Sequence, residues 1–231
     1  MSPRVTAPLF LKNVIGMFEE RKRKSVKRFW STIKNPCSNS ALIFDALEVT
    51  ERQQIHKILE FGASWGGNLR YFMDHLPGLQ TVGIDVNPVV AELATRYPNY
   101  TGIIGDEAVL KNFASEIFDL SFTVSVLDHI PVDRVVEDII VQLVHISKHV
   151  ILLEPFIDGV HGDVSDKTRN QVKRGLERGH KPFAAYSYLW NYDRMLDRIG
   201  SAWQKHAIPL HAGSLGPYYH LYSIRGARDT A

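Results

Sequence analysis

The sequence predicts an α/β protein in which helices flank a doubly wound, seven-stranded sheet, mostly parallel with an antiparallel hairpin at its edge. Three observations support this fold class. The 231 residues are 45% hydrophobic, enough for one buried core. After residue 56, short apolar segments alternate with helical ones, and nearly unbroken apolar runs are typical of strands buried on both faces. Finally, two strand-like segments follow one another near the end of the sequence.

The first fifty residues differ from the rest in charge and pattern. Residues 1–34 carry nine Lys or Arg against Glu19 and Glu20, although the whole chain has a net charge of only +2. The apolar spacing from Leu11 to Ile33 suits one or two amphipathic helices. We therefore expect a basic helical extension or lid over residues 1–50. The main domain is then expected over 51–231, with an insertion at about 156–181.

The individual elements follow from the same alternation. Helices are expected at 67–75, 88–96, 132–147 and 183–199, and a short one within the connecting segment 37–56. The expected strands are 57–61, 81–85, 102–104, 118–126, 149–153, 202–208 and 218–224. The last two, joined by a loop, are expected to form the edge hairpin.

Composition excludes several classes of protein. The single cysteine, Cys37, cannot form an intramolecular disulfide or a cysteine-zinc site, which favours a reducing compartment. No apolar run approaches the ~20 residues that a membrane-spanning helix needs. We therefore expect a cytoplasmic protein without a membrane span. Nucleic acid is not the favoured partner, because no recognised RNA-binding module accompanies the basic extension.

The clearest local signal is the glycine-rich turn in residues 58–68, between an expected strand and an expected helix. Glycine allows a tight turn and a close approach to a ligand, and the amides that begin the next helix can meet an anionic group. The third glycine of the dinucleotide-binding pattern is missing. However, Asp85 ends the next strand, nineteen residues after Gly66, where a carboxylate can accept both hydroxyls of a ribose.

A third acidic position, Asp106-Glu107, follows the next strand and is suitably placed to bind an adenine amino group. The alternative for Asp106 is a turn residue or helix cap.

Together, these residues resemble the class I S-adenosylmethionine-dependent methyltransferases, which have a Rossmann-like fold. The resemblance runs from about residue 56 to 154. It rests on Leu-Glu-Phe-Gly-Ala-Ser-Trp-Gly-Gly-Asn at 59–68, Val-Gly-Ile-Asp-Val-Asn-Pro at 82–88, Gly-Asp at 105–106 and the segment 118–131. Residues 126–131 are similar to small-molecule methyltransferases, and more loosely to methylases of pseudaminic acid and other surface sugars.

The resemblance implies a set of residues around S-adenosylmethionine. It places Asp85 at the ribose, Val86 as an apolar wall for adenine, and Asp128 near the cofactor amine or an acceptor group. The remaining implied contacts are Glu60, Gly62, Ala63 and Gly66 at the methionine part, and Asp106 and Glu107 at adenine. The sequence departs from the common pattern at residues 63–65, where Trp65 would narrow the pocket.

Two residues are candidates for catalysis. His129 follows the fourth strand, at the sheet edge where ligands bind in such folds, and histidine is a common general base near neutral pH. The alternative is that His129 caps the next helix or packs under the cofactor. Glu154 ends the fifth strand and should face the same cleft, with a buried structural role as its alternative. The irregular spacing of His161, Asp163 and His180 predicts no metal site.

The expected function is methyl transfer to an oxygen or nitrogen of a small polar metabolite, with a sugar or nucleotide-linked sugar as the candidate acceptor. Two alternatives remain open. Residues 62–66 also match the nucleophile elbow of α/β serine hydrolases, with Ser64, Asp128 and either His206 or His211 as a triad. The other alternative is a non-catalytic, methyltransferase-like binding subunit. A homodimer is one expected assembly.

Overall fold

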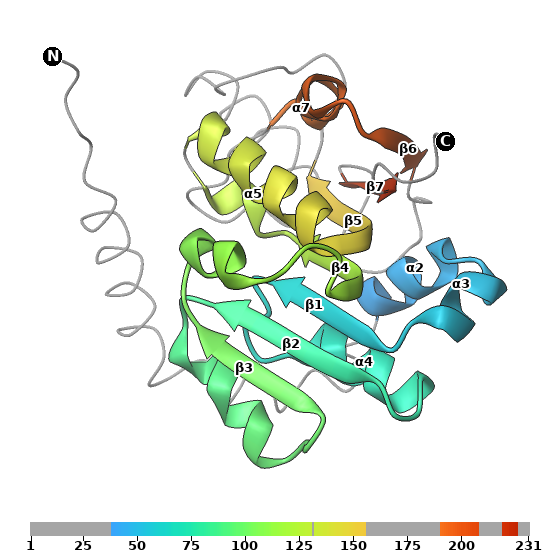
Figure 1. Ribbon diagram of the computed structural model, residues 1–231, viewed down its shortest axis with the longest axis vertical. Helices are drawn as coiled ribbons and strands as arrows, with labels where there is room; N and C mark the ends of the chain where they lie inside the picture. Colours follow the sequence, from blue (N-terminus) through green and yellow to red (C-terminus); the bar gives the residue numbers. More distant parts are fainter. Residues whose placement is uncertain (1–37, 131, 156–189, 208–218, 226–231) are drawn as a thin grey trace, which may run out of the picture. The chain divides into compact units, whose positions relative to one another are not determined.

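The computed structural model describes residues 38–130, 132–155, 190–207 and 219–225 (Figure 1). Seven strands form one sheet in the order β3-β2-β1-β4-β5-β7-β6. They are β1 Lys57–Phe61, β2 Gln80–Asp85, β3 Tyr100–Ile104, β4 Phe118–Val124, β5 Ser147–Pro155, β6 Ala202–Ala207 and β7 Tyr219–Arg225. The first five are parallel, whereas β7 pairs antiparallel with both β5 and β6. The predicted fold class is confirmed.

Helices connect the parallel strands and precede the first one. The α-helices are α2 Ser38–Ala46, α3 Val49–Gln54, α4 Gly67–His75, α5 Asp133–Ile146 and α7 Tyr192–Ile199. The 3-10 helices are η1 Pro88–Thr95, η2 Glu107–Asn112 and η3 Leu127–His129. The segment expected to hold one short helix before β1 therefore holds two, and the one expected at 88–96 is a 3-10 helix. That helix begins at Asn87, whose side chain accepts a hydrogen bond from Val89 N–H.

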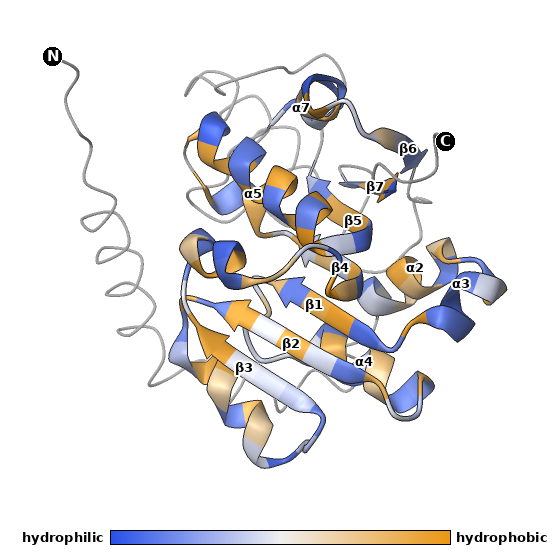
Figure 2. Ribbon diagram, in the orientation of Figure 1, coloured by the Kyte–Doolittle hydropathy of each residue, from blue (hydrophilic) through white to orange (hydrophobic). Residues whose placement is uncertain are grey.

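The core lies on both faces of the sheet, because side chains of a strand alternate between faces. On one face, α5 and α7 pack over a cluster that includes Leu59 and Leu152. On the other face, α2 and α4 cover Ile58 and Ile151. Figure 2 shows the corresponding apolar colour on the inner strands and on one side of α5. Because Ile43 of α2 is fully buried in this second cluster, the core includes chain that precedes residue 51.

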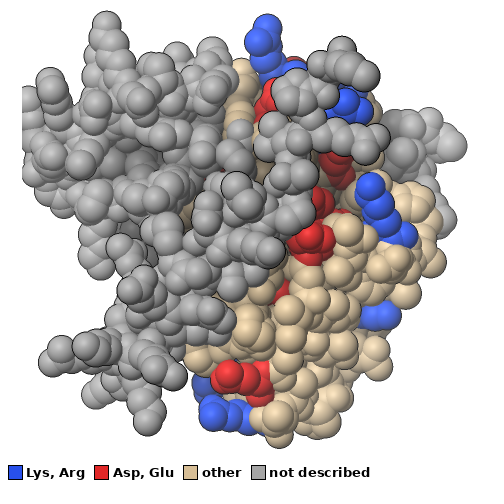
Figure 3. Space-filling model, turned by 90° about the vertical axis from the view of Figure 1, so that its left-hand side faces the viewer, with Lys and Arg blue, Asp and Glu red and all other residues tan. Residues whose placement is uncertain are grey.

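The carboxyl ends of the five parallel strands meet at one edge of the sheet, as the arrowheads of β1, β2 and β3 show in Figure 1. Figure 3 faces this edge and shows Asp and Glu side chains gathered on it. The loops that carry most of the predicted site residues start here. The basic extension up to residue 37, the insertion at 156–181 and His211 lie outside the described residues.

Among the described residues, no helix is long and apolar enough to cross a membrane. The same residues contain no group of three or more His, Cys, Asp or Glu that could hold a metal ion.

Candidate functional site

The glycine turn between β1 and α4 folds back onto β2. The N–H groups of Gly62 and Ala63 both donate to the Ile84 carbonyl, at 2.7 and 3.0 Å, and Gly66 N–H donates to the Ala63 carbonyl at 2.7 Å. Gly62 has φ +82°, and a Cβ built on it would lie 2.2 Å from Cγ2 of Val126. Glycine is therefore required here both by the backbone conformation and by the close approach of the loop after β4.

We expect Gly62→Ala to destabilise the fold by about 1–3 kcal/mol more than a matched glycine substitution, because the new methyl group overpacks against Val126. The control is Gly78→Ala, since Gly78 has φ +83° but no atom within 4 Å of an added Cβ. Urea unfolding of both variants measures the difference. The double variant Gly62→Ala/Val126→Ala should recover most of the excess loss. Equal losses in the two single variants would contradict the steric explanation.

Asp85 holds the glycine turn and the start of η1 together. Its Oδ2 accepts a hydrogen bond from Ser64 N–H and its Oδ1 one from Asn87 N–H, both at 2.7 Å. Burial raises the pKa of the Asp85 carboxyl, while the hydrogen bonds from Asn87 and Ser64 lower it. Each carboxylate oxygen has a further lone pair. Asp85 can therefore organise the turn and still accept hydroxyl donors.

Glu60 lies beneath the same turn and is 2% exposed. Its Oε1 accepts a hydrogen bond of 2.7 Å from the Asn68 side-chain amide. Its Oε2 is buried and has no hydrogen-bond partner among the described residues. Burial, and to a lesser extent the charge of Asp85, raise the pKa of the Glu60 carboxyl to about 8. A buried oxygen without a partner, such as Oε2, can accept a hydrogen bond from a ligand.

Asp106 has a structural role at the start of η2. Its Oδ1 accepts a hydrogen bond of 3.0 Å from Ala108 N–H, so Asp106 is a helix cap, the alternative that the sequence left open. Asp106 and its neighbour Glu107 are both half-buried at the end of β3. Val86 is half-buried beside Asp85, and Ala63 is buried.

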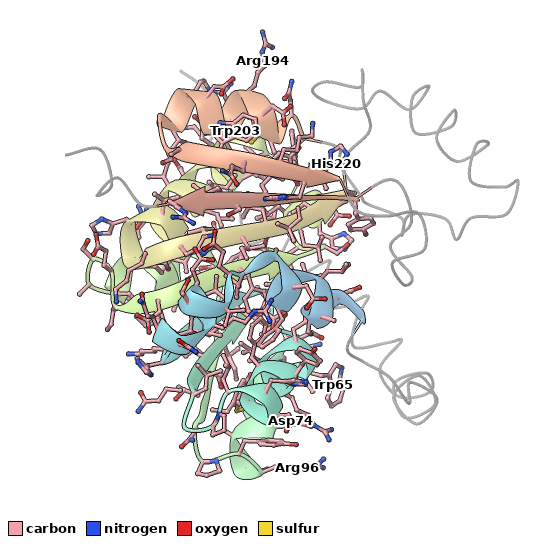
Figure 4. All side chains as sticks on the ribbon, turned by 90° about the vertical axis from the view of Figure 1, so that its right-hand side faces the viewer. Trp65, Asp74, Arg96, Arg194, Trp203 and His220 are labelled. Atoms are coloured by element: carbon pink, nitrogen blue, oxygen red, sulfur yellow. The ribbon has the colours of Figure 1, made fainter. Side chains whose placement is uncertain are left out.

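Trp65 was expected to narrow a pocket. Figure 4 places its side chain beside α4 and directed away from the sheet. The side chain is only partly buried.

The loop after β4 is anchored on several sides. Both carboxyl oxygens of Glu154 accept from Val126 N–H, at 3.1 and 3.2 Å, and Glu154 is fully buried. Trp190 Nε1 donates to the Leu127 carbonyl at 3.1 Å. The hydroxyls of Ser125 and Tyr219 lie 2.6 Å apart. Burial, followed by the charge of Asp128, raises the pKa of the Glu154 carboxyl. Glu154 thus lies behind η3 and supports it.

His129 is the titratable side chain that η3 presents outward. Its side chain is 48% exposed, and its Nε2 lies 3.7 Å from Oδ1 of Asp128, a residue whose side chain is only 2% exposed. The alternative of a helix cap is wrong, because Val132 is the N-cap of α5 and no side chain caps that position. The arrangement places an accessible imidazole next to a buried carboxyl, which can orient it.

Three residues that hold the candidate site together were not predicted from the sequence. Asn68 was part of the recognised motif, yet no signal distinguished it from an ordinary helix-start residue. Trp190 gave no local signal, because the Leu127 carbonyl that it binds is 63 residues away in the sequence. Ser40, which donates to the Asn68 side chain at 2.7 Å, gave no sequence signal because its partner is 28 residues away.

The serine hydrolase alternative can be tested by topology. Ser64 has φ +46°, the kind of strain that a nucleophile elbow shows. However, His206 lies on β6, and the sheet order places four strand spacings, roughly 19 Å, between β1 and β6. A triad needs contacts of about 3 Å. His206 is therefore excluded as the partner of Ser64.

Comparison with known proteins supports the fold strongly but at low identity. No protein-family model matches the sequence, and no curated protein matches it. Among solved structures, an O-methyltransferase family protein from Burkholderia thailandensis has a TM-score of 0.63 at 11% identity. The alignment covers 90% of this chain and 62% of that one, so this chain spans less than two thirds of that relative.

Two further structures match over nearly their whole length. The 1,6-didemethyltoxoflavin-N1-methyltransferase of B. thailandensis, solved with 1,6-didemethyltoxoflavin and S-adenosylhomocysteine, has a TM-score of 0.63 at 13% identity, covering 98% of this chain and 91% of that one. A plantazolicin methyltransferase, solved with S-adenosylhomocysteine and a desmethyl substrate analogue, has a TM-score of 0.62 at 14% identity, covering 94% and 95%. The chain has the fold of S-adenosylmethionine-dependent methyltransferases.

Proposed function

We propose that this protein is an S-adenosylmethionine-dependent methyltransferase acting on an oxygen or nitrogen of a small polar molecule. The observation that carries the proposal is the glycine turn closed by Asp85, with Glu60 below it and Asp106 after the next strand. Glu60 lies near the end of β1, Asp85 ends β2 and Asp106 follows β3, so the three carboxyls share the carboxyl edge of the sheet, where open α/β folds bind ligands. The solved structures with this fold, some holding S-adenosylhomocysteine, add support.

The residues present fit this cofactor. Asp85 is half-buried at the end of β2 and can accept the two ribose hydroxyls. The buried, unpartnered Oε2 of Glu60 suits a cationic donor such as the ammonium group of the methionine part. Asp106 and Glu107 would lie near the adenine, with Val86 at its face. When bound, S-adenosylmethionine supplies an electrophilic methyl group.

In the proposed mechanism the protein mainly positions the reactants, which can account for much of the acceleration of a methyl transfer. His129 accepts the proton that an acceptor hydroxyl or amine loses. Asp128, whose Oδ1 lies 3.7 Å from His129 Nε2, orients the imidazole. We assign Glu154 a positioning role, because its carboxyl is fully buried and accepts the Val126 N–H at the start of η3.

The acceptor is proposed as a small molecule with a hydroxyl or amino group, of which a sugar or nucleotide-linked sugar is one candidate. One structure of the same fold, an N1-methyltransferase, holds the small molecule 1,6-didemethyltoxoflavin together with S-adenosylhomocysteine. The non-catalytic alternative differs in a measurable way. A binding subunit would take up the cofactor but form no S-adenosylhomocysteine with any hydroxylated or amino metabolite offered.

The first test is thermal unfolding of the purified protein with and without S-adenosylhomocysteine. At a hundred times its dissociation constant, the ligand should stabilise the protein by ~2.7 kcal/mol. For a chain of this size, that corresponds to a rise in Tm of roughly 5–11 °C. ATP at the same concentration is the control for a general nucleotide effect. No shift, together with labelling of Ser64 by a fluorophosphonate, would favour hydrolase chemistry instead.

A further inference from the structure

The buried carboxyl of Glu60 is held by one side chain and approached by no cation in the described part of the protein. Asn68 Nδ2 donates to Oε1, while Oε2 is buried without a partner. Ionising a carboxyl in such a place is costly, because the hydrogen bonds from the Asn68 side chain and the Leu69 N–H replace only part of its lost hydration. The Glu60 side chain of the free protein therefore favours its protonated, neutral form near neutral pH.

Asn68 is itself fixed by a residue of α2. The hydroxyl of Ser40, which is fully buried, donates to Asn68 Oδ1 at 2.7 Å. Because this bond occupies the oxygen end of the amide, the Nδ2 end faces Glu60. A relay of two hydrogen bonds thus runs from α2 through the start of α4 to β1. We call Ser40, Asn68 and Glu60 the carboxyl relay.

The titratable groups around the carboxyl relay supply no positive charge to stabilise an ionised Glu60. Asp85 from β2 is in electrostatic contact with Glu60 and raises its pKa. Tyr100 from β3 is also in contact, but its phenol donates to the Val90 carbonyl at 2.9 Å, and burial raises its pKa. The helices contribute the neutral side chains of Ser40 and Asn68. A positive charge at Oε2 would have to come from a ligand.

We infer that Ser40 and Asn68 are positioning residues that aim Glu60 at the cofactor's ammonium group, and that cofactor binding releases one proton from Glu60. This inference rests on the proposed function. As the ammonium N–H groups approach Oε2, the O–H bond of the carboxyl breaks, its proton passes to the buffer and the carboxylate pairs with the ammonium. Asn68 then donates to a charged acceptor, which makes its hydrogen bond stronger.

The proton can be counted by calorimetry of S-adenosylhomocysteine binding at pH 6.5 in buffers of different ionisation enthalpy. We expect the wild-type protein to release close to one proton. Its affinity should rise about tenfold per pH unit from pH 6 and level off near pH 8, where Glu60 ionises without the ligand. Glu60→Gln should release no proton and bind with an affinity that does not change over this range.

Two relay variants test positioning separately from charge. Asn68→Ala should bind S-adenosylhomocysteine about tenfold more weakly and still release the proton. It should also shift the pH at which affinity levels off upward from about 8, because the bond from Asn68 lowers the pKa of Glu60. Ser40→Ala should lose about threefold in affinity, and Ser40→Thr, which keeps the hydroxyl, should restore it. Asp74→Ala, on the exposed side of α4, is the matched control and should bind like the wild type.

The outcomes separate the two proposals. Wild-type binding without proton release, or unchanged affinity and pH dependence in Asn68→Ala, would overturn the carboxyl relay alone. Failure of the wild-type protein to bind S-adenosylhomocysteine at any pH would overturn the proposed function and the relay with it. Thermal unfolding of each variant without ligand checks that it folds. If Glu60→Gln does not fold, the affinity and pH dependence of Asn68→Ala test the carboxyl relay.

Discussion

Replacing His129 by alanine should lower the turnover number by about a hundredfold or more and leave the affinity for S-adenosylhomocysteine unchanged. General acid-base catalysis contributes typically 10²–10⁴-fold, and His129 is the half-exposed titratable group next to the buried Asp128 carboxyl. Its side chain is 48% exposed, so the fold should tolerate its removal. Turnover is measured as formation of S-adenosylhomocysteine with an acceptor found by screening hydroxylated and amino metabolites.

The matched control is His145→Ala, which removes an exposed imidazole from the last turn of α5. This variant should retain wild-type turnover. If His129→Ala also retains it, positioning alone accelerates the reaction and the acceptor loses its proton directly to water. A parallel loss of turnover and cofactor affinity would instead indicate that His129 contacts the cofactor.

Replacing Asp85 by alanine should weaken cofactor binding by about a hundredfold or more. The carboxylate is proposed to accept the ribose hydroxyls, and it also fixes Ser64 and Asn87 through their N–H groups. Hydrogen bonds to a charged group are worth about 1.5–3 kcal/mol each, and the turn loses part of its order as well. Calorimetric titration with S-adenosylhomocysteine measures the loss.

A second variant separates the two roles of Asp85. Asp85→Asn retains one acceptor oxygen and should bind with intermediate affinity. Asp138→Ala removes an exposed carboxyl from α5 and serves as the control for net charge. If Asp85→Ala binds the cofactor as tightly as the wild type while its melting temperature falls, Asp85 is a structural residue of the glycine turn only.

The sequence predicted the parallel part of the fold well because each element carried its own local pattern. The bounds of β1 and α4 agree with the prediction residue by residue, since both flank the glycine turn. By contrast, β3 was predicted at 102–104 but begins at Tyr100, whose buried ring packs beneath the turn. From the sequence alone, the hydroxyl of Tyr100 suits a surface position as well as a buried one, so the start of β3 could not be placed there.

The candidate site was harder to predict than the fold, because the sequence shows which residues lie at the ends of strands but not the direction of their side chains. Asp85 lies at the turn, as expected from its position at the end of β2. Glu154 occupies the same position on β5, yet its carboxyl turns inward and binds the backbone of Val126. Ser40 binds Asn68, 28 residues away in the sequence, and Trp190 binds Leu127, 63 residues away. No local sequence pattern contains such distant pairs.

The place of β7 in the sheet governs when a growing chain can complete this fold. β7 is the last described strand, but it lies between β5 and β6. While the ribosome adds the 70 residues from Pro155 to Arg225, roughly 4–14 s at common elongation rates, β5 has an open edge. Because that edge is apolar and can pair with strands of other chains, the nascent protein is most exposed to misassembly just before its last strand emerges.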